Sequence, residues 1–290
     1  MRNKHFLGIF LSLALFLLGF GLHGNTSLYF NISGLMIVIG GTSGAALLSF
    51  RPSQLANVTR VLFYAYRRPV KKETEIINIL VDLSIRSRID GIISLQKHEH
   101  ETSILFLRRA LGCLVDGYRA EQIRDILNTE TYFFRLRRED SERVVRSISN
   151  YFPAFGIIGS VVGLITMVGG IGDTSVILTA IPIALTSTLY GLIFANFFFL
   201  PFAAKIRERT NHELLLQKII TEGVIAIDSE LNPVILKTKL ESFLTPSERD
   251  TELVPYAKIK ERFKIEKQLE DEDLKDLEKS LQSEVSSAGD

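Results

Sequence analysis

Two hydroxyl-bearing residues, Ser160 and Thr188, lie near the middle of long segments that hold no charged side chain. Both also fall on a face rich in small residues. A hydroxyl on a membrane helix often hydrogen-bonds to its own backbone, so either residue alone would indicate little. Two hydroxyls that face one seam on consecutive helices predict a polar lining, as an ion path would need.

An equally informative feature is the absence of ionisable residues. Asp, Glu, Lys and Arg are missing from four segments, which cover residues 6–22, 24–50, 148–172 and 174–204. Ion-coupled membrane proteins usually hold an ionisable side chain inside the bilayer. If this chain helps to move protons or cations, the titrating carboxylate must therefore come from a partner.

The same four segments define the fold class. Each reaches the length, roughly 17–25 residues, at which an apolar helix crosses a bilayer. Between and after them, apolar residues recur at the three- and four-residue spacing of helices, with Gly91 and Gly117 as expected interruptions. We predict an all-α, polytopic membrane protein with four transmembrane helices and a helical cytoplasmic domain. The predicted regions are 1–50 (spans 1 and 2), 51–147 (cytoplasmic domain), 148–204 (spans 3 and 4), 205–248 (cytoplasmic helices) and 249–290 (charged extension).

Basic residues near the ends of the spans predict their orientation. The two short connections within the pairs of spans contain no Lys or Arg, whereas basic residues flank the other ends, among them Arg2, Lys4, Arg51, Arg60, Arg143, Arg146, Lys205 and Arg207. We therefore expect both termini and residues 51–147 in the cytoplasm.

Small residues and prolines punctuate spans 3 and 4. Helix association in lipid depends on close packing of small residues, and here they form matching stripes at three- to four-residue spacing, which include Gly156, Gly159, Gly163, Ala184 and Gly191. Pro153 and Pro201 mark the cytoplasmic ends of the two spans. Because each proline removes a backbone donor, each predicts either a simple boundary or kink, or a hinge that transmits motion.

Several function classes find no support in the sequence. The charged regions hold no nucleophile, phosphate-binding loop or other catalytic motif, so an enzyme is the least expected class. The sequence has no long basic tract of the kind that binds nucleic acid. The stretch "KHEHE" at 97–101 lacks further ligands at suitable spacing, so we expect neither a bound metal nor a cofactor.

Four motifs carry a family resemblance. "PAFGIIGSVVGL", "ALTSTLYGLIFANFFFLPFAAKI", "LLLQKIITEGVIAI" and "NPVILKTKLESFLTPSER" strongly resemble the flagellar stator family of MotA and its sodium-type relative PomA. The earlier "GLMIVIGGTSGAALLSF" looks like the second span of that family. The match runs through residues 1–248 in order, with the same arrangement of two plus two spans.

This resemblance implies an assembly and an activity in the bacterial inner membrane. Family members form a ring of five copies around two copies of a MotB-type protein, which supplies a transmembrane aspartate. Ions, H⁺ or Na⁺, pass between that aspartate and spans 3 and 4, and the cytoplasmic domains push on the rotor protein FliG. The small-residue stripe would then pack against the partner's helix, in contact with membrane lipid on its other faces.

The resemblance also implies roles for single residues. The span-4 threonine of the family matches Thr188, and its two prolines match Pro153 and Pro201. The span-3 position that is alanine in proton-driven members and threonine in sodium-driven ones falls on Ser160, which leans slightly toward sodium because a hydroxyl can replace part of the ion's hydration shell.

On the rotor side, "RSRIDGIISLQ" resembles the rotor-facing helix of the family. Its functional arginine matches Arg88, and a further acidic position matches Glu130. The paired glutamate falls on Gln96, a departure for which Glu99 or Glu101 could substitute. A solvated helix surface remains the alternative for these positions.

Two other classes of function stay open at this point. One is a TolQ/ExbB-like force generator for outer-membrane energisation, whose members usually have three spans and an outside N-terminus. The other is a structural membrane scaffold, which would conduct no ions and would tolerate loss of both hydroxyls.

Overall fold

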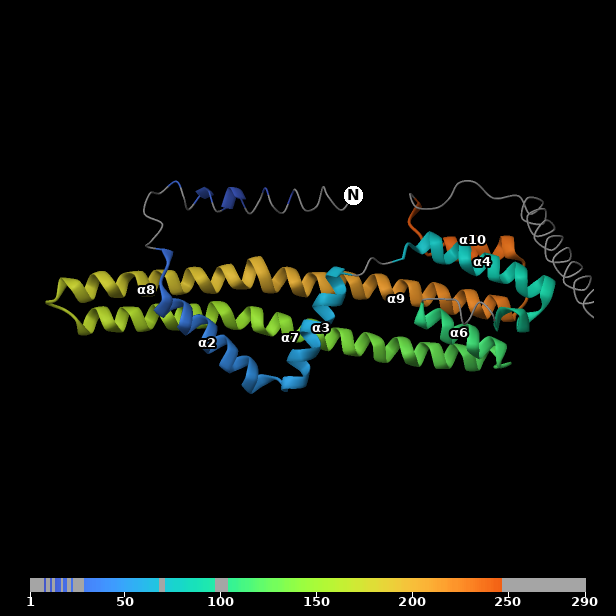
Figure 1. The fold of residues 1–290 in the computed structure, drawn as a ribbon, viewed down its shortest axis with the longest axis horizontal. Helices are drawn as coiled ribbons and strands as arrows, with labels where there is room; N and C mark the ends of the chain where they lie inside the picture. The colour runs from blue at the N-terminus through green and yellow to red at the C-terminus, as the bar shows by residue number, and fades with distance from the viewer. Residues whose placement is uncertain are drawn as a thin grey trace, which may run out of the picture. The chain divides into compact units, whose positions relative to one another are not determined.

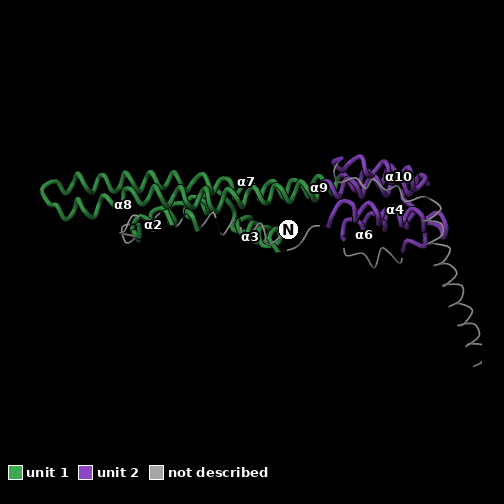
Figure 2. The backbone as a smooth tube through the Cα atoms, turned by 90° about the horizontal axis from the view of Figure 1, so that it is seen from above, with its two compact units in different colours: residues 1–70, 129–214 green, residues 71–128, 215–290 purple. Residues whose placement is uncertain are grey.

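A computed structural model of the chain describes residues 29–67, 71–96 and 104–246, together with isolated positions between 8 and 22. Within these ranges the regular structure is helical throughout. Most of the first expected span, the "KHEHE" stretch with Glu99, and the extension 249–290 lie outside the described residues. The chain divides into two compact units, which Figure 2 colours green (unit 1) and purple (unit 2).

Unit 1 contains the helices that can cross a membrane. It comprises α2 (Ile32–Ser49), α3 (Pro52–Arg67), residues 129–169 of α7 (Ala120–Gly169), α8 (Thr174–Ile193), a π-helix (Phe194–Phe199) and residues 200–214 of α9 (Leu200–Asp228). Three helices are long and apolar enough to span a bilayer, namely Ile32–Ser49, Ala120–Gly169 and Thr174–Asp228. The all-helical prediction and three of the four expected spans are confirmed in this sense, while the fourth stays a prediction.

Local signals fix where two of these helices begin. The Asn31 side chain accepts a hydrogen bond from the backbone N–H of Gly34 and so caps α2. Asp173 caps α8 by accepting from the N–H of Ser175 at 2.9 Å. Such side-chain acceptors satisfy donors that the first turn of a helix leaves without a partner. In Figure 1, α7 and α8 run side by side and are joined by a short turn.

The two family prolines lie within helical backbone instead of ending it. Pro153 is inside α7, which continues on both sides of it. Pro201 follows the π-helix, in which the N–H of Leu200 bonds to the carbonyl of Ala195, five residues back. Because Pro201 has no N–H to offer the preceding turn, a wider turn at this point is a natural accommodation. Both helices therefore continue through these prolines, and a role of either proline as a hinge stays a prediction.

Unit 2 is a helical domain around an aliphatic core. It comprises α4 (Glu73–Asp90), a short 3₁₀ helix (Ile92–Ser94), α6 (Leu105–Val115), residues 120–128 of α7, residues 215–228 of α9, and α10 (Pro233–Glu241). The expected interruptions are confirmed, because Gly91 ends α4 with φ of 82° and Gly117 follows α6 with φ of 77°. Positive φ of this size is strained for residues with a Cβ.

The compact units divide the chain differently from the predicted regions. The stretch expected as one cytoplasmic domain, 51–147, contributes α3 and residues 129–147 to unit 1, and only residues 71–128 to unit 2. Unit 2 is completed by residues after 215, far along the sequence. Charge patterns locate the water-exposed regions, but they do not show which exposed helices share a core.

Candidate functional site

The centre of unit 1 is a seam in which the backbones of α7 and α8 touch. A Cβ placed on Gly191 would lie 2.6 Å from the carbonyl oxygen of Phe152, and one on Gly163 would lie 2.7 Å from the backbone nitrogen of Ala184. At Gly156 the nearest atom would be the carbonyl oxygen of Ser187, at 3.0 Å. Side chains are excluded from these positions by backbone atoms that cannot move aside.

Helix α2 joins the seam at the level of Ser187. This side chain is fully buried and donates to the Ile183 carbonyl at 2.7 Å. Its oxygen would lie 2.6 Å from a Cβ on Gly159 of α7 and 2.8 Å from one on Gly34 of α2. The predicted small residues are therefore used for contacts within the chain, and their expected role toward a partner helix stays a prediction.

The two hydroxyls singled out from the sequence are in contact. Ser160 Oγ lies 2.5 Å from Thr188 Oγ1 and 2.5 Å from the Ala184 carbonyl oxygen. The Gly156 carbonyl oxygen is 3.3 Å from the Ser160 hydroxyl and 3.5 Å from the Thr188 hydroxyl. Both side chains are half-buried. Four oxygens from two helices thus gather at one point of the seam.

This oxygen cluster has a limited chemistry. Each hydroxyl can donate one proton and accept others, and oxygen atoms, carbonyl oxygens among them, are the ligands that hard cations take. The charge-free segments that carry Ser160 and Thr188 supply no carboxylate to titrate. The cluster can therefore line a path for a cation, whereas a proton carrier with a pKa near neutral has to come from elsewhere.

Tyr190 ties the start of α2 to α8, two residues beyond Thr188. Its hydroxyl accepts from the backbone N–H of Asn31 at 2.8 Å and donates to the carbonyl of Tyr29. This role was not expected from the sequence, because Asn31 is 159 residues away from Tyr190 and no local signal pairs them. The contact holds α2 beside the part of α8 that carries the hydroxyl cluster.

A cluster of aromatic rings lies next to the two prolines in the sequence. The Phe152 ring, next to Pro153, stacks on Phe194 at a centroid distance of 5.3 Å and lies 4.7 Å from Phe199. Phe194 and Phe199 are the first and last residues of the π-helix that precedes Pro201. A turn of α7 and a turn of α8–α9 that each lack a regular hydrogen bond therefore pack against each other through one ring cluster.

The expected rotor-facing residues are spread over the two units. Arg88 lies in the last turn of α4 in unit 2, is exposed, and donates to the backbone carbonyl of Glu230. Gln96, just after the 3₁₀ helix, is exposed, and Glu99 lies outside the described residues. Glu130 is half-buried on the part of α7 that belongs to unit 1. Their role at a rotor stays a prediction.

A buried acid in unit 2 was not predicted. The Glu222 carboxylate, 11% exposed, accepts from Lys239 at 2.9 Å and lies 3.2 Å from Arg124 and 3.3 Å from Lys218. Burial alone would raise the pKa of Glu222, but the hydrogen bonds and charges of Lys239, Lys218 and Arg124 outweigh it and hold this pKa below its ordinary value. The carboxylate joins α7, α9 and α10.

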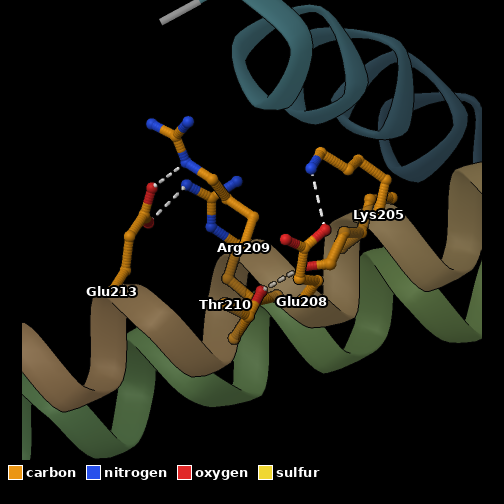
Figure 3. A network of polar contacts seen from close by, with 7 residues as sticks. Lys205, Glu208, Arg209, Thr210 and Glu213 are labelled. Carbon is orange, nitrogen blue, oxygen red and sulfur yellow. Dashed lines mark hydrogen bonds and ion pairs between the residues drawn. The ribbon is translucent and has the colours of Figure 1, made fainter. Parts of the chain in front are cut away.

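Unit 1 holds a second charged cluster, shown in Figure 3. Glu213 accepts from Arg209 at 2.7 Å and from Arg138 at 3.1 Å, and all three side chains are less than one-fifth exposed. The Tyr64 ring of α3 lies 5.4 Å from the Arg209 guanidinium carbon and 5.7 Å from that of Arg138. Three elements of unit 1 therefore meet around one acid and two cations.

Comparisons with known proteins agree with this architecture. The sequence profile of the MotA/TolQ/ExbB proton channel family matches residues 97–218. The chain is 33% identical over 230 residues to the Bacillus subtilis protein YtxD, a match that covers 79% of this chain and 84% of the relative. It is 31% identical over 221 residues to Motility protein A of Borreliella burgdorferi, a match that covers 76% of this chain and 85% of the relative. It is similar to a chain in the structure of the flagellar MotAB stator complex from Bacillus subtilis, with a TM-score of 0.78, 26% identity, and coverage of 84% of this chain and 96% of that one. The chain therefore belongs to the MotA/TolQ/ExbB proton channel family, among its motility protein A members.

Proposed function

We propose that this chain is a flagellar motor stator subunit of the inner membrane, which with a MotB-type partner converts an ion gradient into torque. The observation that carries the proposal is its similarity, over most of its length, both to Motility protein A and to a chain of the MotAB stator complex. An enzymatic role has no place in this account.

A partner's carboxylate completes the ion path. The charge-free segments 148–172 and 174–204 leave the Ser160–Thr188 cluster without an ionisable neighbour of its own. We infer that the transmembrane aspartate of a MotB-type chain supplies it, within an assembly of five copies of this chain around two of the partner. The termini then lie in the cytoplasm, as the flanking basic residues favour.

The oxygen cluster favours Na⁺ over H⁺ as the transported ion. Two hydroxyls and two backbone carbonyls can replace water around a cation, whereas a proton path needs only the titrating carboxylate and a chain of water. Swimming speed at fixed pH, with sodium exchanged for potassium, tests this. We expect speed to rise and saturate with sodium, and Ser160→Ala to reduce speed and to weaken its dependence on sodium.

A matched control separates the path from general helix packing. The Thr166 hydroxyl also lies on α7, but it bonds to the carbonyl of Val162 within its own helix, at 2.9 Å. Thr166→Ala should leave the sodium dependence unchanged. Speed that ignores sodium in the wild type and collapses with a protonophore would make this a proton-driven stator, with Ser160 as a packing residue.

Torque on the rotor would pass through the exposed end of α4. Exposed charge pairs contribute only about 0–1 kcal/mol each, which suits contacts that form and break quickly. Arg88→Glu should lower motility and be partly rescued by a charge reversal on FliG, while Arg88→Lys, which keeps the charge, should have a smaller effect. Failure of every such pairing would remove Arg88 from the interface.

The side of the membrane on which the N-terminus lies distinguishes a stator subunit from a TolQ/ExbB-like force generator. A TolQ/ExbB-like force generator usually has an outside N-terminus, whereas the stator arrangement places it in the cytoplasm. A reporter fused at residue 1 that is active only in the cytoplasm would support the stator arrangement. Activity outside the cytoplasm would favour the rival.

A further inference from the structure

We propose that a groove between α3 and α7 in unit 1 binds the headgroup of an anionic phospholipid. The groove encloses about 450 Å³ and is lined by residues 54–64 of α3 and 134–144 of α7. This inference uses the membrane placement of α2 and α7 from the proposed function, but it requires no rotor contact.

The lining of the groove combines positive charge with apolar surface. Arg60, Arg137 and Arg138 contribute cations, and Asp140 is its one acidic lining residue. Among the ion pairs of the described residues, Arg60 and Arg137 take part in none, whereas Asp140 lies 3.7 Å from Arg143 outside the groove. The groove therefore carries an excess of positive charge that an anion would complete.

Arg138 is held in place at the wall of the groove. Its guanidinium pairs with Glu213 and lies 5.1 Å from the ring centre of Phe134 and 5.7 Å from that of Tyr64, both of which line the groove. Glu213 is shared with Arg209, so this group of three side chains keeps one net positive charge. Planar guanidinium groups bind phosphate in a bidentate manner, and a positioned one is suited to such a ligand.

The location of the groove suggests that the phosphate belongs to a lipid. Helix α3 begins three residues after α2 ends at Ser49, and its Phe63 and Tyr66 side chains are 60% and 58% exposed. The charge-free segment of α7 starts at residue 148. The end of the groove nearest to it, at Val144, is four residues away, which is about 6 Å along the helix. A headgroup layer is roughly 5–8 Å thick on each side of a bilayer.

The apolar part of the lining also favours a lipid over free phosphate. Val61 and Val144 line the groove beside the arginines, and such surface would contact glycerol and acyl carbons but gains nothing from a small inorganic anion. Basic pockets beside membrane helices on the cytoplasmic side are a known means of binding anionic lipids.

Lipid retention by the intact complex tests the proposal. The chain would be purified with its MotB-type partner, reconstituted with phosphatidylglycerol in a phosphatidylcholine background, and examined by native mass spectrometry. We expect bound phosphatidylglycerol on the wild type and about thirtyfold weaker binding for Arg60→Gln combined with Arg137→Gln. The control pair Arg67→Gln and Arg207→Gln removes the same charge from unit 1 outside the groove and should bind almost as the wild type does.

Three results would overturn the proposal. Equal retention by all three proteins would show that the groove does not hold the lipid. Displacement of the lipid by inorganic phosphate, with phosphate bound in phosphatidylcholine alone, would indicate a site for a soluble anion. Absence of phosphatidylglycerol from a correctly assembled wild type would indicate that a neighbouring copy covers the groove. Lipid binding in a complex that generates no torque would instead contradict the proposed function alone.

Discussion

The seam between α7 and α8 and the core of unit 2 are both made of packed helices, yet they use opposite kinds of residue. In the seam, Gly156, Gly163 and Gly191 bring backbone atoms into contact. In unit 2, fully buried leucines and isoleucines fill the space between helices, among them Leu80, Leu107, Leu111, Ile123 and Ile219. The two regions therefore differ in the type of residue that makes the contacts.

The difference follows from the solvent around each region. In water, burial of large apolar side chains drives helices together. In lipid that drive is absent, and association depends on close approach of small residues and on interhelical hydrogen bonds. The exposed leucines and isoleucines of α7 and α8, such as Ile157, Ile165 and Leu185, therefore face outward, while hydroxyls and glycines face the seam.

The seam and the core of unit 2 are therefore suited to different roles. One elementary charge that crosses ~100 mV releases roughly 2.3 kcal/mol, which can bias a packing step but not disrupt an interlocked aliphatic core. The seam is held by backbone contacts and by the Ser160–Thr188 pair instead of large apolar side chains, and we propose that it can shift at that energy.

The largest expected effect is a cavity in the aliphatic core. Leu111 of α6 is 1% exposed, so Leu111→Ala should lower the free energy of unfolding by about 2–5 kcal/mol. The midpoint of thermal unfolding of the purified complex measures this. Leu105→Ala makes the same change on the same helix at a side chain that is 76% exposed, and it should change the midpoint little. Similar losses for both variants would show that unit 2 is not packed as described.

A substitution in the seam should cost less free energy of unfolding than Leu111→Ala, but it should reduce motility more. Gly191→Ala places a methyl group against the Phe152 carbonyl, and overpacking of this kind costs about 1–3 kcal/mol. The helices should separate at the hydroxyl cluster, which abolishes swimming in soft agar while the protein still reaches the membrane. Gly44→Ala, with nothing within 4 Å of the added carbon, is the control. Normal swimming of Gly191→Ala would contradict a backbone-to-backbone seam.

The smallest effect concerns the charged group around Glu222 in unit 2. Glu222→Gln weakens the contacts to Lys239, Lys218 and Arg124 and should cost about 1–2 kcal/mol. Because the folded state lowers the pKa of Glu222, its stabilisation is present above the ordinary pKa and is lost as pH falls through the lower folded value.

Midpoints of thermal unfolding, measured from neutral pH into the acid range, test the direction of this pH dependence. The difference in unfolding midpoint between wild type and Glu222→Gln should shrink as pH falls below 4.5, the ordinary pKa of glutamate. The control Glu208→Gln alters an exposed pair with Lys205 and should show no such gap. A gap that widens in acid would contradict the lowered pKa.

The sequence predicts the features that depend on one segment at a time. The lengths of the apolar segments predict the three described spans, and the end of α4 at Gly91 was expected from the interruption that this glycine makes in a helical pattern. Helical spacing also placed Ser160 and Thr188 on facing stripes, and the two hydroxyls are in contact. Their role in ion transport remains to be tested.

The features that sequence analysis missed all join distant segments. Tyr190 meets Asn31, Glu222 meets Arg124, and Arg138 meets Glu213. Each of these residues has an unremarkable neighbourhood in the sequence, because exposed helices carry many charges and only tertiary packing selects which of them pair.

Rotation of single motors tests most directly whether this chain is a stator subunit. Cells that lack stator subunits of their own would express this chain with its native MotB-type partner, and the torque on a bead attached to one flagellum would be recorded. We expect stepwise gains of torque as complexes engage, and none for Pro153→Leu at equal membrane abundance. An assembled wild-type complex that never turns the motor would contradict the assignment of this chain as a stator subunit.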